Sequence, residues 1–199
     1  MNQTDNNNYD DDEHFDPTII RTKNRIFQMQ QRALIALRHS EASDALVAKH
    51  PKIFRDIGGD PMKTCMAWGI DCGVGWFDII DCLCEELQNY CNRHNLVYNS
   101  ENNEYINIAE DDPRYIQVVA LQVKEKYGTL RFYASGSDDV TSAMIRLAEE
   151  MSARICETCG SSTKMSKMAD RIIPICAKCD AAHEANHNNE QFRSGDMKQ

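Results

Sequence analysis

The sequence lacks the features that direct a chain into a membrane or out of the cell. It has no apolar run near the ~20 residues that span a bilayer, and its first residues are polar and acidic where a secretory signal is basic and then apolar. It also lacks the basic stripe that nucleic-acid-binding proteins present, and its net charge is −9. We therefore expect a cytoplasmic protein, with neither a membrane nor a nucleic acid as its partner.

The negative charge is concentrated at the N-terminus. Residues 1–16 contain six Asp or Glu residues and no Lys or Arg, so the rest of the chain is only mildly acidic. Because residues 1–15 are also rich in Asn, we expect them to form a disordered tail. The chain of 199 residues is long enough for one domain with a substantial core.

Cysteine is abundant, with nine residues, and the lack of an export signal argues that these thiols stay reduced. Four of them form two C-x2-C pairs that are separated by 16 residues: Cys156 with Cys159, and Cys176 with Cys179. This spacing is typical of a zinc site, because two facing knuckles place four thiolates near the corners of a tetrahedron. Four thiolates also close the coordination shell, so we expect one structural zinc ion and not a catalytic one.

The surroundings of these pairs contain further groups that bear on the metal. Gly160 follows the first pair, at a position where the knuckle turn often needs positive φ. His183 and His187 follow the second pair, and either could replace a cysteine as ligand, although the simpler interpretation places both on the exposed face of a terminal helix. The basic residues that could offset the negative charge of four thiolates are Lys164, Lys167, Arg171 and Lys178.

Hydrophobic periodicity predicts the helices. Apolar residues at helical spacing indicate a long helix over 16–39, a break at 40–43 and a short helix at 44–49. The heptad-like spacing of the first helix allows a homodimer through residues 16–39, and packing on the chain's own core is the other interpretation. A clear apolar stripe predicts a helix over 77–95. A further helix after Asp138 is expected to place these residues on its core face: Val140, Met144, Leu147, Met151 and Ile155.

The predicted strands are few. Segments 115–126 and 130–134 are rich in β-forming residues and flank a turn, so they predict a β-hairpin. Segments 164–168 and 172–175 could form a small ribbon between the two cysteine pairs. Residues 99–113 are expected to form a polar loop.

The glycine-rich stretch from Cys65 to Trp76 is the best candidate for a ligand site. It is not a phosphate-binding loop, because no Gly-Lys-Ser/Thr ends it, but it leads into a helix N-terminus, where free N–H groups favour anions. Its tryptophans could flank a flat ligand while the hairpin supplies positive charge. The candidate ligand-binding residues are Trp68, Asp71, Gly73, Gly75, Trp76, Lys124, Lys126 and Arg131. In the alternative interpretation, the glycines allow close packing and the tryptophans cap the core.

Catalysis finds little support in the sequence. A cysteine nucleophile needs a base beside an activated thiolate. Cys72, next to Asp71, is the candidate nucleophile, but no feature marks a histidine as its partner. We therefore assign no catalytic residue and favour a non-enzymatic function.

Three segments carry a resemblance to a known family: Cys65–Ile80 with its CGVGWFDII run, Gln122–Tyr133 with VKEKYGTLRFY, and Ala148–Gly160 with CETCG. Together they resemble a family of small uncharacterised proteins that are common in tailed phages, prophages and bacterial genomes. The resemblance covers about residues 45–183 and implies a phage-borne protein in the host cytoplasm, with no known activity. The chain differs in having Val74 where relatives have an acid, and a second knuckle of Cys-Ala-Lys-Cys where many have a Cys/His pair.

These features together predict an α+β domain, with helices packed on a small antiparallel β-hairpin and a C-terminal zinc knuckle or ribbon. The expected parts are a disordered acidic tail (1–15), an N-terminal helical extension (16–44), an α+β core (45–155) and the zinc segment (156–188). We expect a non-enzymatic module that binds a host protein or a small anionic ligand, in a host-takeover or anti-defence role. The alternatives are an enzyme that acts on a small nucleotide-like substrate at the Trp68–Trp76 loop, and a zinc-ribbon nucleic-acid binder.

Overall fold

The computed structural model describes residues 17–163, 165–168 and 171–182, and within this range it gives an α+β fold, which confirms the predicted class. The chain divides into two compact units, Met1–Arg38 and His39–Gln199. In the first unit, the described residues belong to helix α1 (Pro17–Lys49), which continues into the second unit. Among the described helices, none has both the length and the apolar character needed to cross a bilayer.

Helix α1 corrects one prediction, because it runs without interruption through the expected break at 40–43. The serines of this segment suggested a cap, but Ala42 and Ala45 favour helix. Ala42, Leu46 and Val47 also pack against the main hydrophobic core. Burial of this apolar face therefore outweighs the weak local preference of serine for a helix end.

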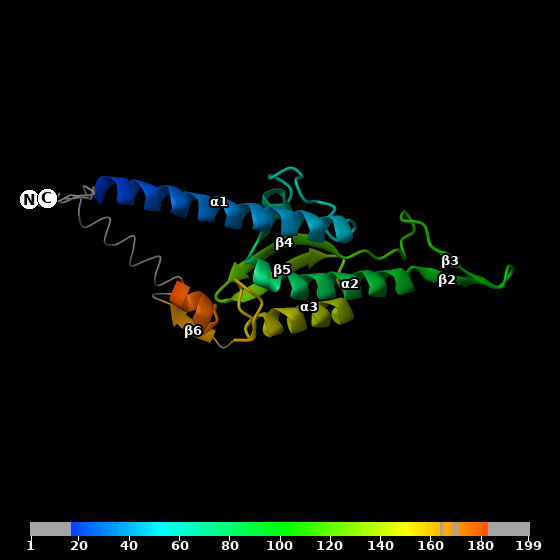
Figure 1. The fold of residues 1–199 in the computed structure, drawn as a ribbon. Helices are drawn as coiled ribbons and strands as arrows, with labels where there is room; N and C mark the ends of the chain where they lie inside the picture. Colours follow the sequence, from blue (N-terminus) through cyan, green and yellow to red (C-terminus); the bar gives the residue numbers. More distant parts are fainter. Residues whose placement is uncertain (1–16, 164, 169–170, 183–199) are drawn as a thin grey trace, which may run out of the picture. The chain divides into compact units, whose positions relative to one another are not determined.

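The second unit is built on a three-stranded sheet in the order β1–β4–β5. Strands β4 (Val119–Lys126) and β5 (Thr129–Ser135) pair antiparallel, which confirms the predicted hairpin, and the short strand β1 (Ile70–Asp71) runs parallel to β4. Helices α2 (Phe77–His94) and α3 (Asp139–Ser152) lie side by side and α3 packs against β5 (Figure 1). Two short 3₁₀ helices, η1 (Cys65–Trp68) and η2 (Val74–Trp76), flank β1.

One continuous core holds these elements together. It takes its fully buried members from the segment after α1, the loop before α2, α2 itself and the hairpin. The largest of these side chains are Ile53, Phe54, Met66, Trp76, Ile80, Leu87, Val123 and Leu130.

Residues 99–113, predicted as a loop, contain the turn and the second strand of a further hairpin, which β2 (Leu96–Asn99) and β3 (Glu104–Asn107) form (Figure 1). The prediction was wrong because the stretch is polar and all four residues of β3 are exposed, so no pattern of buried apolar residues marks the strand. Tyr98 and Tyr105 are directly opposite, with ring centroids 5.4 Å apart in an edge-to-face arrangement. Such cross-strand aromatic pairs stabilise hairpins.

Helix α3 corrects a further prediction, since Val140, Leu147 and Met151 of the expected core face are exposed. The residues buried on α3 are Thr141, Ile145, Ala148 and Ser152. The apolar stripe is thus turned partly towards solvent, and the buried face combines the apolar Ile145 and Ala148 with the polar Thr141 and Ser152.

The C-terminal segment contains the small ribbon that was predicted between the cysteine pairs. Strands β6 (Met165–Met168) and β7 (Arg171–Pro174) pair antiparallel, and a short helical stretch follows at residues 177–182.

Candidate metal centre and the adjoining loop

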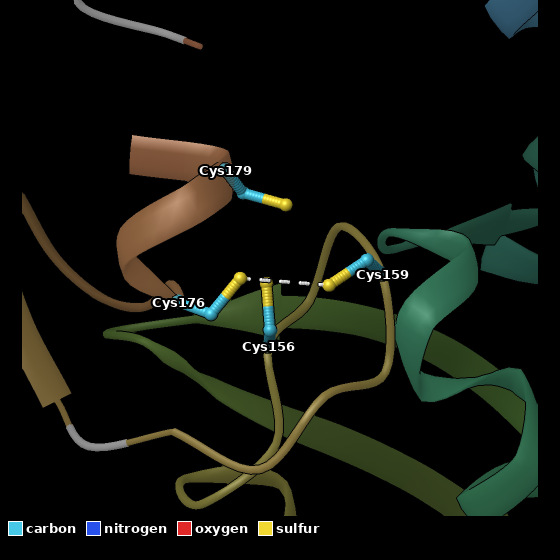
Figure 2. A group of neighbouring side chains, drawn as sticks. All are labelled: Cys156, Cys159, Cys176 and Cys179. Carbon is cyan, nitrogen blue, oxygen red and sulfur yellow. Dashed lines mark hydrogen bonds between the residues drawn. The ribbon is translucent and has the colours of Figure 1, made fainter. Parts of the chain in front are cut away.

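The four predicted cysteine ligands come together in the structure. Cys156 and Cys159 lie in the loop after α3, and Cys176 and Cys179 lie at the start of the final helical stretch (Figure 2). Their four Sγ atoms all lie within 4.8 Å of one another, and those of Cys159 and Cys176 are 3.6 Å apart. A tetrahedral zinc ion with Zn–S bonds of ~2.3 Å separates its sulfur ligands by ~3.8 Å, so this group can hold a metal ion.

Backbone hydrogen bonds shape the first knuckle before any metal is considered. The amide of Cys156 donates to the carbonyl of Ser161, and the amide of Gly160 donates to the carbonyl of Cys156, both at 2.8 Å. Gly160 has φ +76°, as its place after the cysteine pair predicted, and only glycine adopts this value without strain. The tight turn therefore depends on this one residue.

The second knuckle is held to the first by the main chain as well. The amide of Asp180 donates to the carbonyl of Cys176 at 2.9 Å, which starts the helical stretch. The amide of Glu157 donates to the carbonyl of Pro174 at 3.0 Å, and the Thr163 hydroxyl donates to the carbonyl of Ile175 at 2.8 Å. These links bring the two cysteine pairs face to face.

The thiols of the cluster have different acidities. Hydrogen bonds from the side chain and backbone of Ser161 lower the pKa of Cys159 to about 6, whereas burial raises the pKa of Cys179. Four adjacent thiols cannot all lose their protons without a counter-charge. A bound cation supplies that charge and favours the thiolate of each ligand, which couples metal binding to proton release.

The glycine-rich loop docks directly on the first knuckle. The amide of Gly75 donates to the carbonyl of Glu157 at 2.8 Å, and the indole N–H of Trp76 donates to the carbonyl of Ile155 at 2.9 Å. The amide of Gly73 donates to the carboxylate of Glu157 at 2.9 Å. A Cβ atom on Gly75 would lie 2.2 Å from the Cys156 carbonyl oxygen, so the glycines serve close packing.

The candidate ligand-binding residues are only partly brought together. Trp76 has no exposed surface, whereas Trp68 is 79% exposed. Lys124 lies in register with Asp71 on β1 and with Arg131 on β5, so these three charged residues share one row of the sheet. Lys126 is further along β4, beside the turn, with its Nζ 5.4 Å from the centroid of the Tyr127 ring.

A polar pocket of about 400 Å³ lies next to this row of charges. It includes Asp71 and Lys124 from the predicted set, and it adds His39 and Glu157, which the sequence reasoning missed. The full lining is His39, Ile70, Asp71, Cys72, Lys124, Glu125 and Glu157. No local pattern marks His39 or Glu157, because each reaches the pocket from a distant part of the sequence. With three carboxylates against one lysine and one histidine, the pocket is more acidic than basic.

Cys72, the candidate nucleophile, lies in the wall of this pocket. Burial raises the pKa of its thiol, and the nearby carboxylates of Glu157 and Asp71 raise it further. The Nε2 atom of His39 lies 2.9 Å from the backbone carbonyl of Cys72, which accepts its hydrogen bond. The thiol is therefore neutral at physiological pH and a poor nucleophile.

Several predicted groups fall outside the described residues or side chains. These are the side chains of Lys164, Lys167 and Arg171, and the alternative ligands His183 and His187. Comparisons of the chain with family models, with curated proteins and with solved structures found no match.

Proposed function

We propose that this protein is a non-enzymatic binding module in which one structural zinc ion holds the C-terminal segment on the α+β core. The donor set supports zinc, because four cysteine sulfurs at near-tetrahedral spacing suit a soft, closed coordination shell. Zinc bound in this way supplies folding energy and no open position for substrate.

The packing of the glycine-rich loop on the first knuckle is the observation that carries the proposal. Gly73 and Gly75 are in contact with the backbone of Cys156 and Glu157, and Trp76 is buried behind them. Gly73, Gly75 and Trp76, which suggested a ligand-binding loop in the sequence, thus pack against the cysteine cluster and support it. This assigns them a structural role and leaves the outer surfaces of the core for recognition.

We further propose that the partner is a protein, which would be a host protein in the phage context that the resemblance implies. The acidic lining of the His39 pocket supports this choice over a small anionic ligand, because its carboxylates would repel an anion. The function of the bound host protein would decide whether the role is host takeover or anti-defence.

Native mass spectrometry of the protein purified from cells tests the proposal. We expect one zinc ion per chain and no retained small molecule. Cys176→Ser together with Cys179→Ser should lose the metal, whereas Cys65→Ser, which changes an exposed cysteine outside the cluster, should retain it.

A retained small molecule that Asp71→Ala or Lys124→Ala removes, with the zinc unchanged, would contradict a protein-binding module and point to the His39 pocket. Absence of any metal in freshly purified protein would contradict the zinc assignment.

A further inference from the structure

Helices α2 and α3 leave an apolar groove of about 350 Å³ on the outside of the second unit. Its floor is formed by the buried side chains of Ile79, Leu83 and Ala148. Its wall on α3 is formed by Leu147 and Met151, which are 63% and 47% exposed. The remaining lining residues are Asp78, Cys82, Glu86 and Met144. Met144, Leu147 and Met151 belong to the stripe of α3 that the sequence pattern predicted for the core.

The charged residues that line this groove are of one sign. Asp78 and Glu86 line it two turns apart on α2, and none of the nine lining residues is basic. An apolar groove with acidic edges fits an amphipathic helix that has basic residues beside its apolar face.

Residues 17–38 of α1 have the complementary chemistry. They contain five Lys or Arg residues and no Asp or Glu. In the structure this segment exposes the apolar side chains of Ile26, Phe27, Leu34 and Leu37. Leu34 follows Phe27 by seven residues, and Leu37 follows Leu34 by three. These spacings place the three side chains on one face of the helix. Because the segment is already helical, docking would not require it to fold first.

We propose that residues 17–38 of a second copy of this chain dock in the groove between α2 and α3. Phe27 and Leu34 are ~10 Å apart along a helix and Asp78 and Glu86 are ~12 Å apart, so the two surfaces match in length. Leu147 and Met151 receive the apolar face of the segment, and Arg38, which is exposed and lies on the same side of the helix as Phe27 and Leu34, pairs with the acidic edge. Each copy offers one segment and one groove, so reciprocal docking gives a dimer. This arrangement differs from a coiled coil of two α1 helices and goes beyond the proposed function.

The test is sedimentation-equilibrium analysis of the full-length, zinc-loaded protein. We expect a concentration-dependent dimer that is weakened at least tenfold by Leu147→Asp in the groove and by Phe27→Asp/Leu34→Asp in the segment. Leu96→Asp, at an exposed leucine of β2, is the matched control and should leave the dimer intact. Circular dichroism and zinc content verify that each variant is folded, and neither measurement depends on a host partner.

Charge reversal provides a second, independent readout. Asp78→Lys/Glu86→Lys in one chain and Arg38→Glu in another should each dimerise poorly alone. Mixed together, they should form a heterodimer, because opposite charges then face each other in both contacts.

Three outcomes would overturn the proposal. A wild-type protein that stays monomeric at 100 µM excludes the dimer. A dimer that segment variants break and groove variants do not is a pairing of α1 helices. A dimer that groove variants break and segment variants do not uses another surface of the second copy. The zinc assignment is tested separately, because it depends on the measured metal content and not on the number of subunits.

Discussion

Gly75 occupies a position where a single methyl group decides whether two distant segments can meet. Its Cβ would lie 2.2 Å from the Cys156 carbonyl oxygen and 2.5 Å from the Gly160 nitrogen. Both obstacles are backbone atoms, which cannot rotate away as the end of a flexible side chain can. Gly75 is therefore required because it has no side chain, which lets the loop and the first knuckle pack together.

We expect Gly75→Ala to destabilise the protein by ~1–3 kcal/mol, the usual cost of forcing extra volume into a packed site. The first knuckle must move off the loop, which also weakens the hydrogen bond from the Gly75 amide to the Glu157 carbonyl. Urea denaturation measures the change. Val74→Ala is the control in the same loop, at a more exposed side chain, and should alter stability little. An unchanged Gly75→Ala protein would show that the knuckle does not pack on the loop.

At the scale of the element, helix α3 shows how polar residues can take the buried face of a helix. The Ser152 hydroxyl accepts a hydrogen bond from the Leu130 amide at 2.8 Å and donates to the Glu149 carbonyl at 2.5 Å. Thr141 is satisfied by its hydrogen bonds with Asp138 at the start of the helix. Because each buried polar atom has a partner, its burial carries no large penalty.

The start of α3 is held by a capping box with a charged member. The Asp138 side chain accepts from the Thr141 amide and the Thr141 hydroxyl accepts from the Asp138 amide, both at 2.8 Å. The Tyr90 hydroxyl of α2 also donates to the Asp138 carboxylate, which ties the two helices together. Hydrogen bonds from the Thr141 backbone and then from Tyr90 lower the pKa of Asp138 to about 2.

This depressed pKa predicts an acid-dependent loss of stability. The folded pKa is below the unfolded value of ~3.9, so the contribution is fully present above pH ~4 and is lost as the pH falls toward 2. We expect the melting temperature of Asp138→Asn, which retains a capping side chain, to be a few degrees below wild type at pH 7. The two should converge near pH 2. A difference that stays constant from pH 7 to pH 2 in thermal melts would contradict this role of the carboxylate.

The sequence could predict the elements better than their buried faces. Helix α2 and the β4–β5 hairpin follow from strong local periodicity, and the structure confirms both. The exposed stripe of α3 was assigned to the core because periodicity measures which residues are apolar, not which side is covered. The side is decided by partners such as Leu130, which lies 22 residues from Ser152 in the sequence.

At the scale of the whole molecule, the same limit applies to the metal centre. The spacing of its cysteines is local information, and it predicted all four members of the cluster correctly. The loop that supports the cluster contacts it through residues about 80 positions apart in the sequence, such as Trp76 and Ile155. No local sequence pattern predicts such a contact. The glycines suggested a ligand loop because packing and ligand binding both require the absence of a side chain.

The main core and the cysteine cluster are separate parts of the molecule, since the core cluster extends from Leu46 to Ala148 and ends before Cys156. Removal of zinc should therefore loosen the molecule locally. We expect chelation to lower the melting temperature by ~10 °C, on the basis that a ligand at 1,000 times its Kd contributes roughly 4 kcal/mol.

Hydrogen exchange measured by mass spectrometry, with and without a chelator, locates this loss. We expect faster exchange in residues 156–182, whose contacts depend on the cysteine cluster, and also in residues 72–76, since the amides of Gly73 and Gly75 donate to Glu157. Exchange in α2 and in strands β4 and β5 should stay slow, because their packing belongs to the main core. Cys65→Ser controls for thiol chemistry outside the cluster. If the metal-free protein melts cooperatively at an unchanged temperature, zinc does not hold this segment, because a ligand that stabilises only the folded state must raise its melting point.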